Sequence, residues 1–279
     1  MTERVFVMGA GRAGRGLARA FRASGVDVVG VHGRHAASEP DDVTAGAIPP
    51  EIARATTVLV TVRDAQLDDA LAELSLARLG TGSVVLHASG SADPAGLLAL
   101  RERGHPAGTF HPLVPFIDPK LAPERLRRAW IGIDGDDAAI AASERLAASL
   151  GARTVRIPPG EKARYHAAAV VVANFPAVLL AIGERLLAGA GVPPEDARDA
   201  LLPLLVAAVE NLRGRPASEA LTGPIVRGDA ETIRAHLAAI AGDDRALEVY
   251  RLLSLNAIDL ARLAGTNEAE LERITELLR

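Results

Sequence analysis

Cysteine is absent from this chain of 279 residues, and aromatic residues make up only 3% of it. Without cysteine the chain has no disulfide, no thiolate nucleophile and no thiolate metal ligand. The few aromatic side chains and the net charge of −4 argue against base-stacking platforms and polyanion-binding surfaces, so we expect no nucleic-acid partner. The histidines do not cluster with acidic residues at metal-ligand spacing, so we expect no metal.

Long hydrophobic runs are also scarce, with one exception at 167–183, AAAVVVANFPAVLLAIG. It is at the lower limit of length for a membrane span, carries Asn174 and Pro176 in its middle, and lacks an aromatic belt. A helix that is apolar on all sides can equally form the centre of a helical domain or a dimer interface. Because the first expected strand starts by residue 4, we expect no signal peptide. The prediction is a cytoplasmic protein with no membrane partner.

Glycine, in contrast, is placed in a recognisable pattern, because Gly9, Gly11 and Gly14 have the spacing G-x-G-x-x-G. This pattern is weak by itself, and its context decides its meaning. An apolar run at 5–8 precedes it, a helical pattern follows it, and a second apolar run occupies 26–31. Such a βαβ unit places a pyrophosphate over the loop and at the helix N-terminus. We predict that the cofactor is held by Gly9, Ala10, Gly11, Arg12, Ala13, Gly14, Thr61 and Val62.

The end of the second strand indicates which dinucleotide binds. An NAD site normally carries an acidic residue there, which bonds the ribose 2′-hydroxyl. Here the sequence reads His32-Gly33-Arg34-His35, with no acid. A guanidinium at Arg34 suits a 2′-phosphate, so NADP is the predicted cofactor, although an ordinary surface arginine would read the same way.

Apolar runs alternate with helical patterns through the first half of the chain, which is typical of an α/β fold with a doubly wound, mostly parallel Rossmann sheet. Further strands are predicted at 57–62, 83–87, 107–110, 130–133 and 154–157. After Pro158-Pro159-Gly160 only helices are predicted, at 161–189, 194–213, 230–241, 244–264 and 267–278. We therefore predict an NADP-binding domain at 1–157 and an all-α domain at 158–279, which would hold substrate and form a homodimer.

Candidate catalytic residues follow the strands and open the helical half. Lys162 and His166 are four residues apart on one helix, so they share a face, and a buried lysine can donate a proton or polarise a carbonyl. His111 follows a strand and is the competing donor. Each has a plain structural reading as well, Lys162 as a solvated first-turn residue and the two histidines as a core or loop residue.

Three further polar residues are candidates for binding substrate. Ser89 and Ser91 follow the strand at 83–87 and suit a carboxylate, although plain turn chemistry explains them equally well. Asn174 lies in the apolar helix, where it can either contact substrate or cap carbonyls freed by Pro176.

The chain resembles the 6-phosphogluconate-dehydrogenase-like group of Rossmann oxidoreductases, which includes ketopantoate reductase and prephenate dehydrogenase. The resemblance is carried by GAGRAG at 9–14, HASG at 87–90, FHPLVPF at 110–116, KARYHAAAVVVANF at 162–175 and LTGPIVRGD at 221–229. These motifs are most similar to a branch that pairs a Rossmann-like domain with a helical C-terminal domain of unknown function.

The resemblance implies a catalytic lysine at Lys162, with His166 where the wider group has asparagine, and a histidine near the nicotinamide at His111. It also implies that Ser89 lies near substrate. The expected activity is NADP-dependent reduction of a small carbonyl or imino acid, with a ketopantoate-like 2-oxo acid as the most specific guess. The alternative is a non-catalytic NADP-binding sensor or partner module on a dehydrogenase frame.

Overall fold

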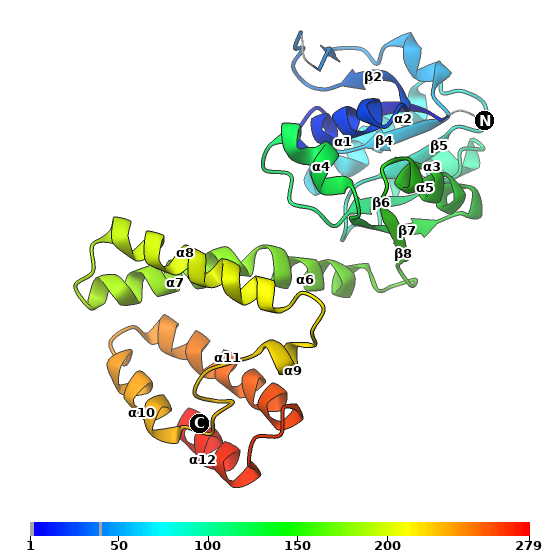
Figure 1. Cartoon of the computed structure of the whole chain (residues 1–279). Coiled ribbons are helices and arrows are strands. Elements are labelled where there is room, and N and C mark those ends of the chain that lie inside the picture. Colours follow the sequence, from blue (N-terminus) through cyan, green and yellow to red (C-terminus); the bar gives the residue numbers. More distant parts are fainter. Residues whose placement is uncertain (1–2, 39–40) are drawn as a thin grey trace. The chain divides into compact units, whose positions relative to one another are not determined.

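A computed structural model describes residues 3–38 and 41–279 (Figure 1). The chain divides into two compact units, Met1–Ala173 and Asn174–Arg279. The first unit is an α/β sandwich and the second is helical, so the predicted fold class is confirmed.

The first unit is built on one sheet in the order β3-β2-β1-β4-β5-β6-β7-β8. Its strands are β1 Arg4–Met8, β2 Asp27–His32, β3 Val43–Thr44, β4 Thr57–Val60, β5 Val84–His87, β6 Ala107–Pro112, β7 Trp130–Gly135 and β8 Arg153–Arg156. All neighbouring pairs are parallel except β6 and β7. The carboxyl ends of β1, β4, β5 and β6 therefore lie along one edge, which is where open α/β sheets bind ligands.

Both faces of the sheet are covered by helices, and successive residues of a strand pack alternately against the helices of one face and of the other. Val5 and Val7 belong to a core shared with α1 Arg12–Ala23, α4 Ala122–Leu126 and α5 Asp137–Ser149. Phe6 and Met8 belong to a core shared with α2 Leu67–Leu76 and α3 Gly96–Glu102 on the other face. A strand buried on both sides needs a continuous apolar run, which is the pattern that made these strands predictable.

Several short elements have no counterpart among the predictions. They are β3, the four-residue helix α9 Ala217–Ala220, the five-residue helix α4, and the 3₁₀ turns at Pro50–Arg54, Asp64–Gln66 and Pro119–Leu121. Each is too short to complete a hydrophobic period, so the sequence carries no periodic signal for it.

Helix α6, Lys162–Ala173, belongs to the same compact unit as the sheet, whereas the sequence predicted a boundary between the two domains at residue 157. The physical reason lies in its first turns. Lys162 is buried against the sheet, and the Tyr165 hydroxyl lies 2.9 Å from His111 on β6. These contacts attach the start of the long apolar segment to the Rossmann unit.

The second unit contains α7 Phe175–Gly189, α8 Pro194–Asn211, α9, α10 Ala230–Ala239, α11 Asp244–Leu263 and α12 Glu268–Leu278. Its buried core lies among the last three helices and consists of Ile233, Ile258, Ala261, Leu271, Ile274 and Leu278. Side chains cap the N-termini of α10 and α12, since Asp229 accepts a hydrogen bond from the Thr232 amide at 3.0 Å and Asn267 accepts one from the Ala269 amide at 3.0 Å. Such caps satisfy helix donors that have no partner within the helix.

The segment Lys162–Gly189 is long and apolar enough to cross a membrane by length and composition alone. It is the one segment of the described chain with this property, and its most apolar window is not buried. Its first turn, however, carries an ion-paired lysine that packs on the sheet.

Candidate functional site

The glycine loop joins β1 to α1, and two of its glycines are required by close packing. Gly9 has a φ of +117°, and a Cβ there would lie 2.7 Å from Thr61 Oγ1. A Cβ on Gly14 would overlap the carbonyl oxygen of Gly9. The Thr61 hydroxyl donates to that same carbonyl at 2.7 Å, so the loop is held against the end of β4. Gly11 has open space where its Cβ would point, as a loop facing a pyrophosphate requires.

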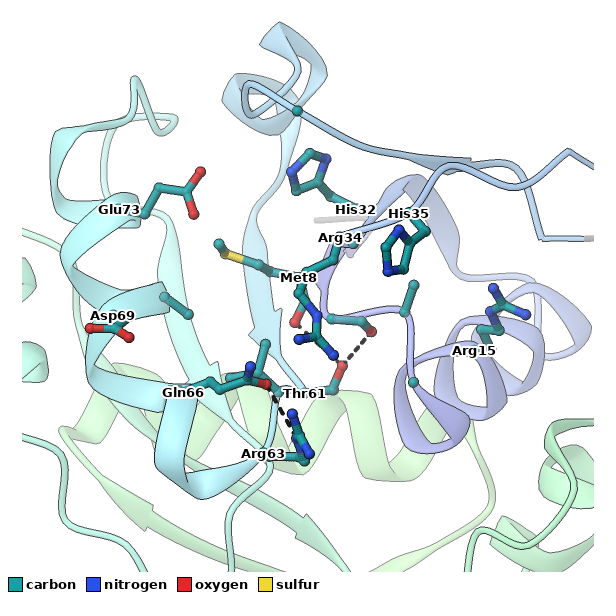
Figure 2. A pocket seen from close by; sticks show the side chains of 17 residues that line it. Met8, Arg15, His32, Arg34, His35, Thr61, Arg63, Gln66, Asp69 and Glu73 are labelled. Carbon is teal, nitrogen blue, oxygen red and sulfur yellow. Dashed lines mark hydrogen bonds between the residues drawn. The ribbon is translucent and has the colours of Figure 1, made fainter.

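A cavity of about 660 Å³ lies over this loop (Figure 2). Of the residues predicted to hold the cofactor, six line it, namely Gly9, Ala10, Gly11, Arg34, Thr61 and Val62. Arg12 is exposed on the first turn of α1, and Arg12, Ala13 and Gly14 are outside the cavity lining. Gly14 contributes through packing instead, and the loop backbone leaves room for a dinucleotide.

The cavity wall contains three arginines, of which sequence reasoning found only Arg34. Arg15 lies in the first turns of α1, with its Nε 3.7 Å from a carboxylate oxygen of Asp41. Arg63 follows β4 and donates to Gln66 at 3.4 Å. Figure 2 shows Arg34 and Arg63 near Thr61 and Arg15 on the α1 side. The position of Arg15, four residues after Gly11 at a helix start, was the signal available in the sequence.

A second cluster, which we call the histidine cluster, consists of His111, Tyr165 and His166. His111 lies in β6, and the other two residues lie in the first turns of α6. The Tyr165 hydroxyl is 2.9 Å from His111 Nδ1, and the His111 and His166 rings meet edge to face with centroids 5.6 Å apart. The structure thus brings two of the three predicted catalytic residues together, and adds Tyr165.

Burial controls the protonation of the histidine cluster. Burial first and the neighbouring His166 second lower the pKa of His111 to about 4, whereas Asp64 acts in the opposite direction. Burial also raises the pKa of Tyr165 to about 12. At neutral pH His111 is therefore a neutral imidazole and Tyr165 a neutral phenol.

The loop after β5 lies against the histidine cluster. A Cβ on Gly90 would be 2.7 Å from His166 Nδ1 and 2.8 Å from His111 Nε2, so only glycine fits there. Ser89 is buried and its Oγ accepts from the Ala92 amide at 3.1 Å, while Ser91 donates to Asp64 at 3.0 Å. Ser89 thus makes a local turn contact, whereas Ser91 bonds a carboxylate in the segment that follows β4.

Lys162 lies outside the histidine cluster. Its side chain is buried, and its ammonium contacts Asp93 at 2.6 Å, Asp134 at 3.0 Å and the carbonyl oxygen of Ala92 at 3.1 Å. These three acceptors match the three N–H donors of the ammonium. Neighbouring His87 is fully buried, and burial followed by the charge of Lys162 lowers its pKa to about 4.

Asn174 belongs to the second unit, where it is the exposed residue before α7 and its side chain makes no capping hydrogen bond. Within residues 3–38 and 41–279, no three His, Asp or Glu side chains form a group suited to a metal ion. The absence of a metal stays a prediction.

The lowered pKa values of His87 and His111 predict how stability depends on pH. Both are near 4 in the fold, against 6.5 for an unperturbed histidine, so the unfolded chain binds more protons between these values. Stability from this source is complete above pH about 6.5 and is lost as pH falls to about 4. The drop in Tm from pH 7 to pH 5 should be smaller in His87→Gln than in wild type. His35→Gln, at an exposed site, should match wild type, and identical drops in all three proteins would contradict the assignment.

Two protein-family models match the chain, one in its N-terminal part and one in its C-terminal part. Residues 2–112 match the model of a Rossmann-like domain, and residues 129–257 match a domain of unknown function, DUF2520. No curated protein sequence matches the chain significantly.

Solved structures resemble the whole chain at low identity. A Bacteroides fragilis protein named as a candidate NADP oxidoreductase is 22% identical, with 92% of this chain and 98% of that chain covered and a TM-score of 0.69. A Thermotoga maritima protein is also 22% identical, with 95% and 99% covered and a TM-score of 0.69. Plasmodium falciparum pyrroline carboxylate reductase, solved with NADP bound, is 14% identical, with 99% and 98% covered and a TM-score of 0.55. At these identities the likeness establishes the fold alone, and NADP oxidoreductases are among the structural neighbours.

Proposed function

We propose that this protein is an NADP-dependent oxidoreductase that reduces a small carbonyl or imino acid, most specifically a ketopantoate-like 2-oxo acid. One observation carries the proposal. The dinucleotide-sized cavity at the ends of β1 and β4 and the histidine cluster beside the ends of β5 and β6 lie along one edge of one sheet. Asp64 and Ser91, joined at 3.0 Å, connect the two regions.

The chain's own residues account for cofactor selectivity. Arg34 follows β2, where an acid would favour NAD, and its guanidinium is suited to the ribose 2′-phosphate. The open space at Gly11 and the free amides at the start of α1 suit the pyrophosphate. Arg15 and Arg63 add positive charge to the same cavity.

In the proposed reaction the histidine cluster supplies the proton that accompanies hydride transfer. When bound, the reduced nicotinamide provides the hydride that is transferred to a carbonyl or imine carbon. As His111 donates its ring proton to the oxygen or nitrogen on which negative charge develops, its other nitrogen takes the hydroxyl proton of Tyr165, 2.9 Å away, so the imidazole stays neutral and solvent reprotonates the phenolate. Because burial keeps His111 neutral, the site carries no fixed positive charge at that position before reaction.

Between the two candidate donors, we favour His111 over Lys162. All three N–H groups of Lys162 already have acceptors, two of them carboxylates, so proton transfer to substrate would break the ion pairs that stabilise a buried ammonium. In this proposal Lys162 acts structurally, by fixing the start of α6. Binding of NADP without turnover of any oxo or imino acid would instead indicate the sensor function.

Replacing Arg34 by Asp should weaken NADP binding far more than NAD binding. A charge-assisted hydrogen bond contributes roughly 1.5–3 kcal/mol, or about 10- to 100-fold in Kd, and repulsion adds to the loss. Isothermal titration with NADP measures it. Arg22→Asp makes the same charge change at the far end of α1 and should leave the affinity near wild type. Equal NADP affinity in wild type and Arg34→Asp would remove Arg34 from the site.

Replacing His111 by Gln should lower kcat by about 10²-fold or more, as expected when a general acid is lost, with NADP affinity unchanged. The assay follows NADPH oxidation across a panel of small 2-oxo acids and cyclic imino acids. Lys162→Met should reduce Tm, because the start of α6 loses its ion pairs, and should lower turnover per folded molecule less than His111→Gln does. The reverse result, with full turnover in His111→Gln and loss in folded Lys162→Met, would transfer the donor role to Lys162.

We also propose that the chain forms a homodimer through α7 and α8. Of the described residues in these two helices, Ala197 alone is buried. Many of their large apolar side chains are exposed, namely Phe175, Val178, Leu179, Leu202, Leu204, Val206, Val209 and Leu212 of the helix C-cap. The hairpin also carries charged pairs such as Glu184–Arg198 at 3.2 Å. Such a mixture suits a protein partner better than lipid, and two identical hairpins supply matching apolar surfaces.

Light scattering at micromolar concentration should give the mass of a dimer. Leu204→Glu should shift it to a monomer, because Leu204 is 66% exposed on the proposed interface. Leu98→Glu is the matched control, since Leu98 is 62% exposed on α3 of the first unit and should leave the dimer intact. A wild-type monomer would refute the proposal.

A further inference from the structure

We infer that Tyr165 holds His111 in the neutral tautomer that carries its hydrogen on Nε2, so that the site presents a hydrogen-bond donor and selects a substrate atom that accepts. The tautomer itself is a property of the chain. Its meaning for substrate choice rests on the proposed function.

The contacts of the Tyr165 oxygen determine where its hydrogen goes. The oxygen is 2.9 Å from His111 Nδ1 and 3.4 Å from the carbonyl oxygen of His111, two acceptors for the one hydrogen of the phenol. Of these two acceptors, Nδ1 is the closer. Glycine at 132 makes this possible, because a Cβ there would overlap the Tyr165 hydroxyl.

The protonation states of the two side chains then determine which nitrogen of His111 carries its hydrogen. Tyr165 has a pKa of about 12 and keeps its hydrogen at neutral pH, while His111 has a pKa of about 4 and is neutral. A neutral imidazole has one donor and one acceptor nitrogen. Since Nδ1 accepts from Tyr165, the hydrogen of His111 is on Nε2.

That Nε2 lies beside the loop after β5, where a Cβ on Gly90 would approach it to 2.8 Å. His166 Nδ1, a buried nitrogen for which the described residues provide no hydrogen-bond partner, lies beside the same glycine. A substrate atom that reaches Nε2 would meet a donor from His111. A carbonyl oxygen accepts such a bond, whereas the N–H of a protonated imine cannot, so the tautomer favours a 2-oxo acid over an iminium substrate.

Nuclear magnetic resonance of ¹⁵N-histidine-labelled protein at pH about 7 tests the tautomer without substrate or cofactor. The His111 signals are identified as those missing from His111→Gln. In wild type we expect Nε2 to be the protonated nitrogen and Nδ1 the acceptor. Tyr165→Phe should shift the Nδ1 signal and redistribute the hydrogen between the two nitrogens. Tyr250→Phe is the matched control, because Tyr250 makes the same contact, at 2.8 Å, with His236 Nδ1. It should change His236 and leave His111 as in wild type.

Protonation of His111 on Nδ1 in wild type would overturn the inference, as would unchanged His111 signals in folded Tyr165→Phe. If Tyr165→Phe does not fold, the wild-type spectrum alone still decides. The spectrum reports the His111 tautomer without any turnover. A protein that shows the expected spectrum but has no activity would therefore contradict the proposed function and leave the tautomer inference intact. In an active protein, Tyr165→Phe should lower kcat with little change in KM, and oxo acids should outperform cyclic imines. The opposite substrate preference would overturn the inferred selectivity.

Discussion

The buried ammonium of Lys162 is the interaction on which the histidine cluster depends. It joins α6 to the loop after β5 through Asp93 and to β7 through Asp134. A buried lysine is tolerated only when its charge is paired and its donors are satisfied, and removing a partner is strongly destabilising. Tyr165 and His166 lie within the next turn of α6, so the ion pair fixes the position from which they reach His111. The loop is thereby held against α6, with its Gly90 facing His111 and His166.

Two glycine contacts complete the same arrangement. Gly90 lets the loop after β5 approach both histidines, and Gly132 lets β7 approach the tyrosine hydroxyl. On the cofactor side, Gly14 lets α1 approach the Gly9 carbonyl, and Thr61 secures that carbonyl. In both halves of the candidate site, glycine lets the backbone come so close to a neighbouring group that a side chain at that position would collide with it. Because the strands that carry them are parallel neighbours, both halves open at one edge of the sheet.

The sequence predicted the fold well, because buried parallel strands and a G-x-G-x-x-G turn leave strong local signals. Strands β1, β2 and β4 to β8 were all predicted, while β3 and α4 were too short to show a period. The cofactor loop was predictable for the same local reason. Arg15 was overlooked because its role depends on which face of α1 borders the cavity.

The candidate catalytic residues were harder to assign, because their chemistry depends on contacts between distant segments. Lys162 and His166 share a helix face by spacing, yet one reaches Asp93 and Asp134 and the other reaches His111. Nothing local predicts that Tyr165 meets His111, 54 residues earlier in the chain. The aromatic and acidic side chains that set the protonation of these residues come together only in the folded chain, where β5, β6 and β7 lie beside α6.

The central claim is that this chain transfers hydride from NADPH, with His111 as the donor to the heteroatom. Transfer of isotope tests it most directly. NADPH carrying deuterium at C4 of the nicotinamide is incubated with the protein and a panel of small 2-oxo and cyclic imino acids, and the products are examined by mass spectrometry. The account predicts deuterium on the former carbonyl carbon of a 2-oxo acid, with little transfer by His111→Gln. Absence of label from every compound, in a protein shown to bind NADPH, would contradict it.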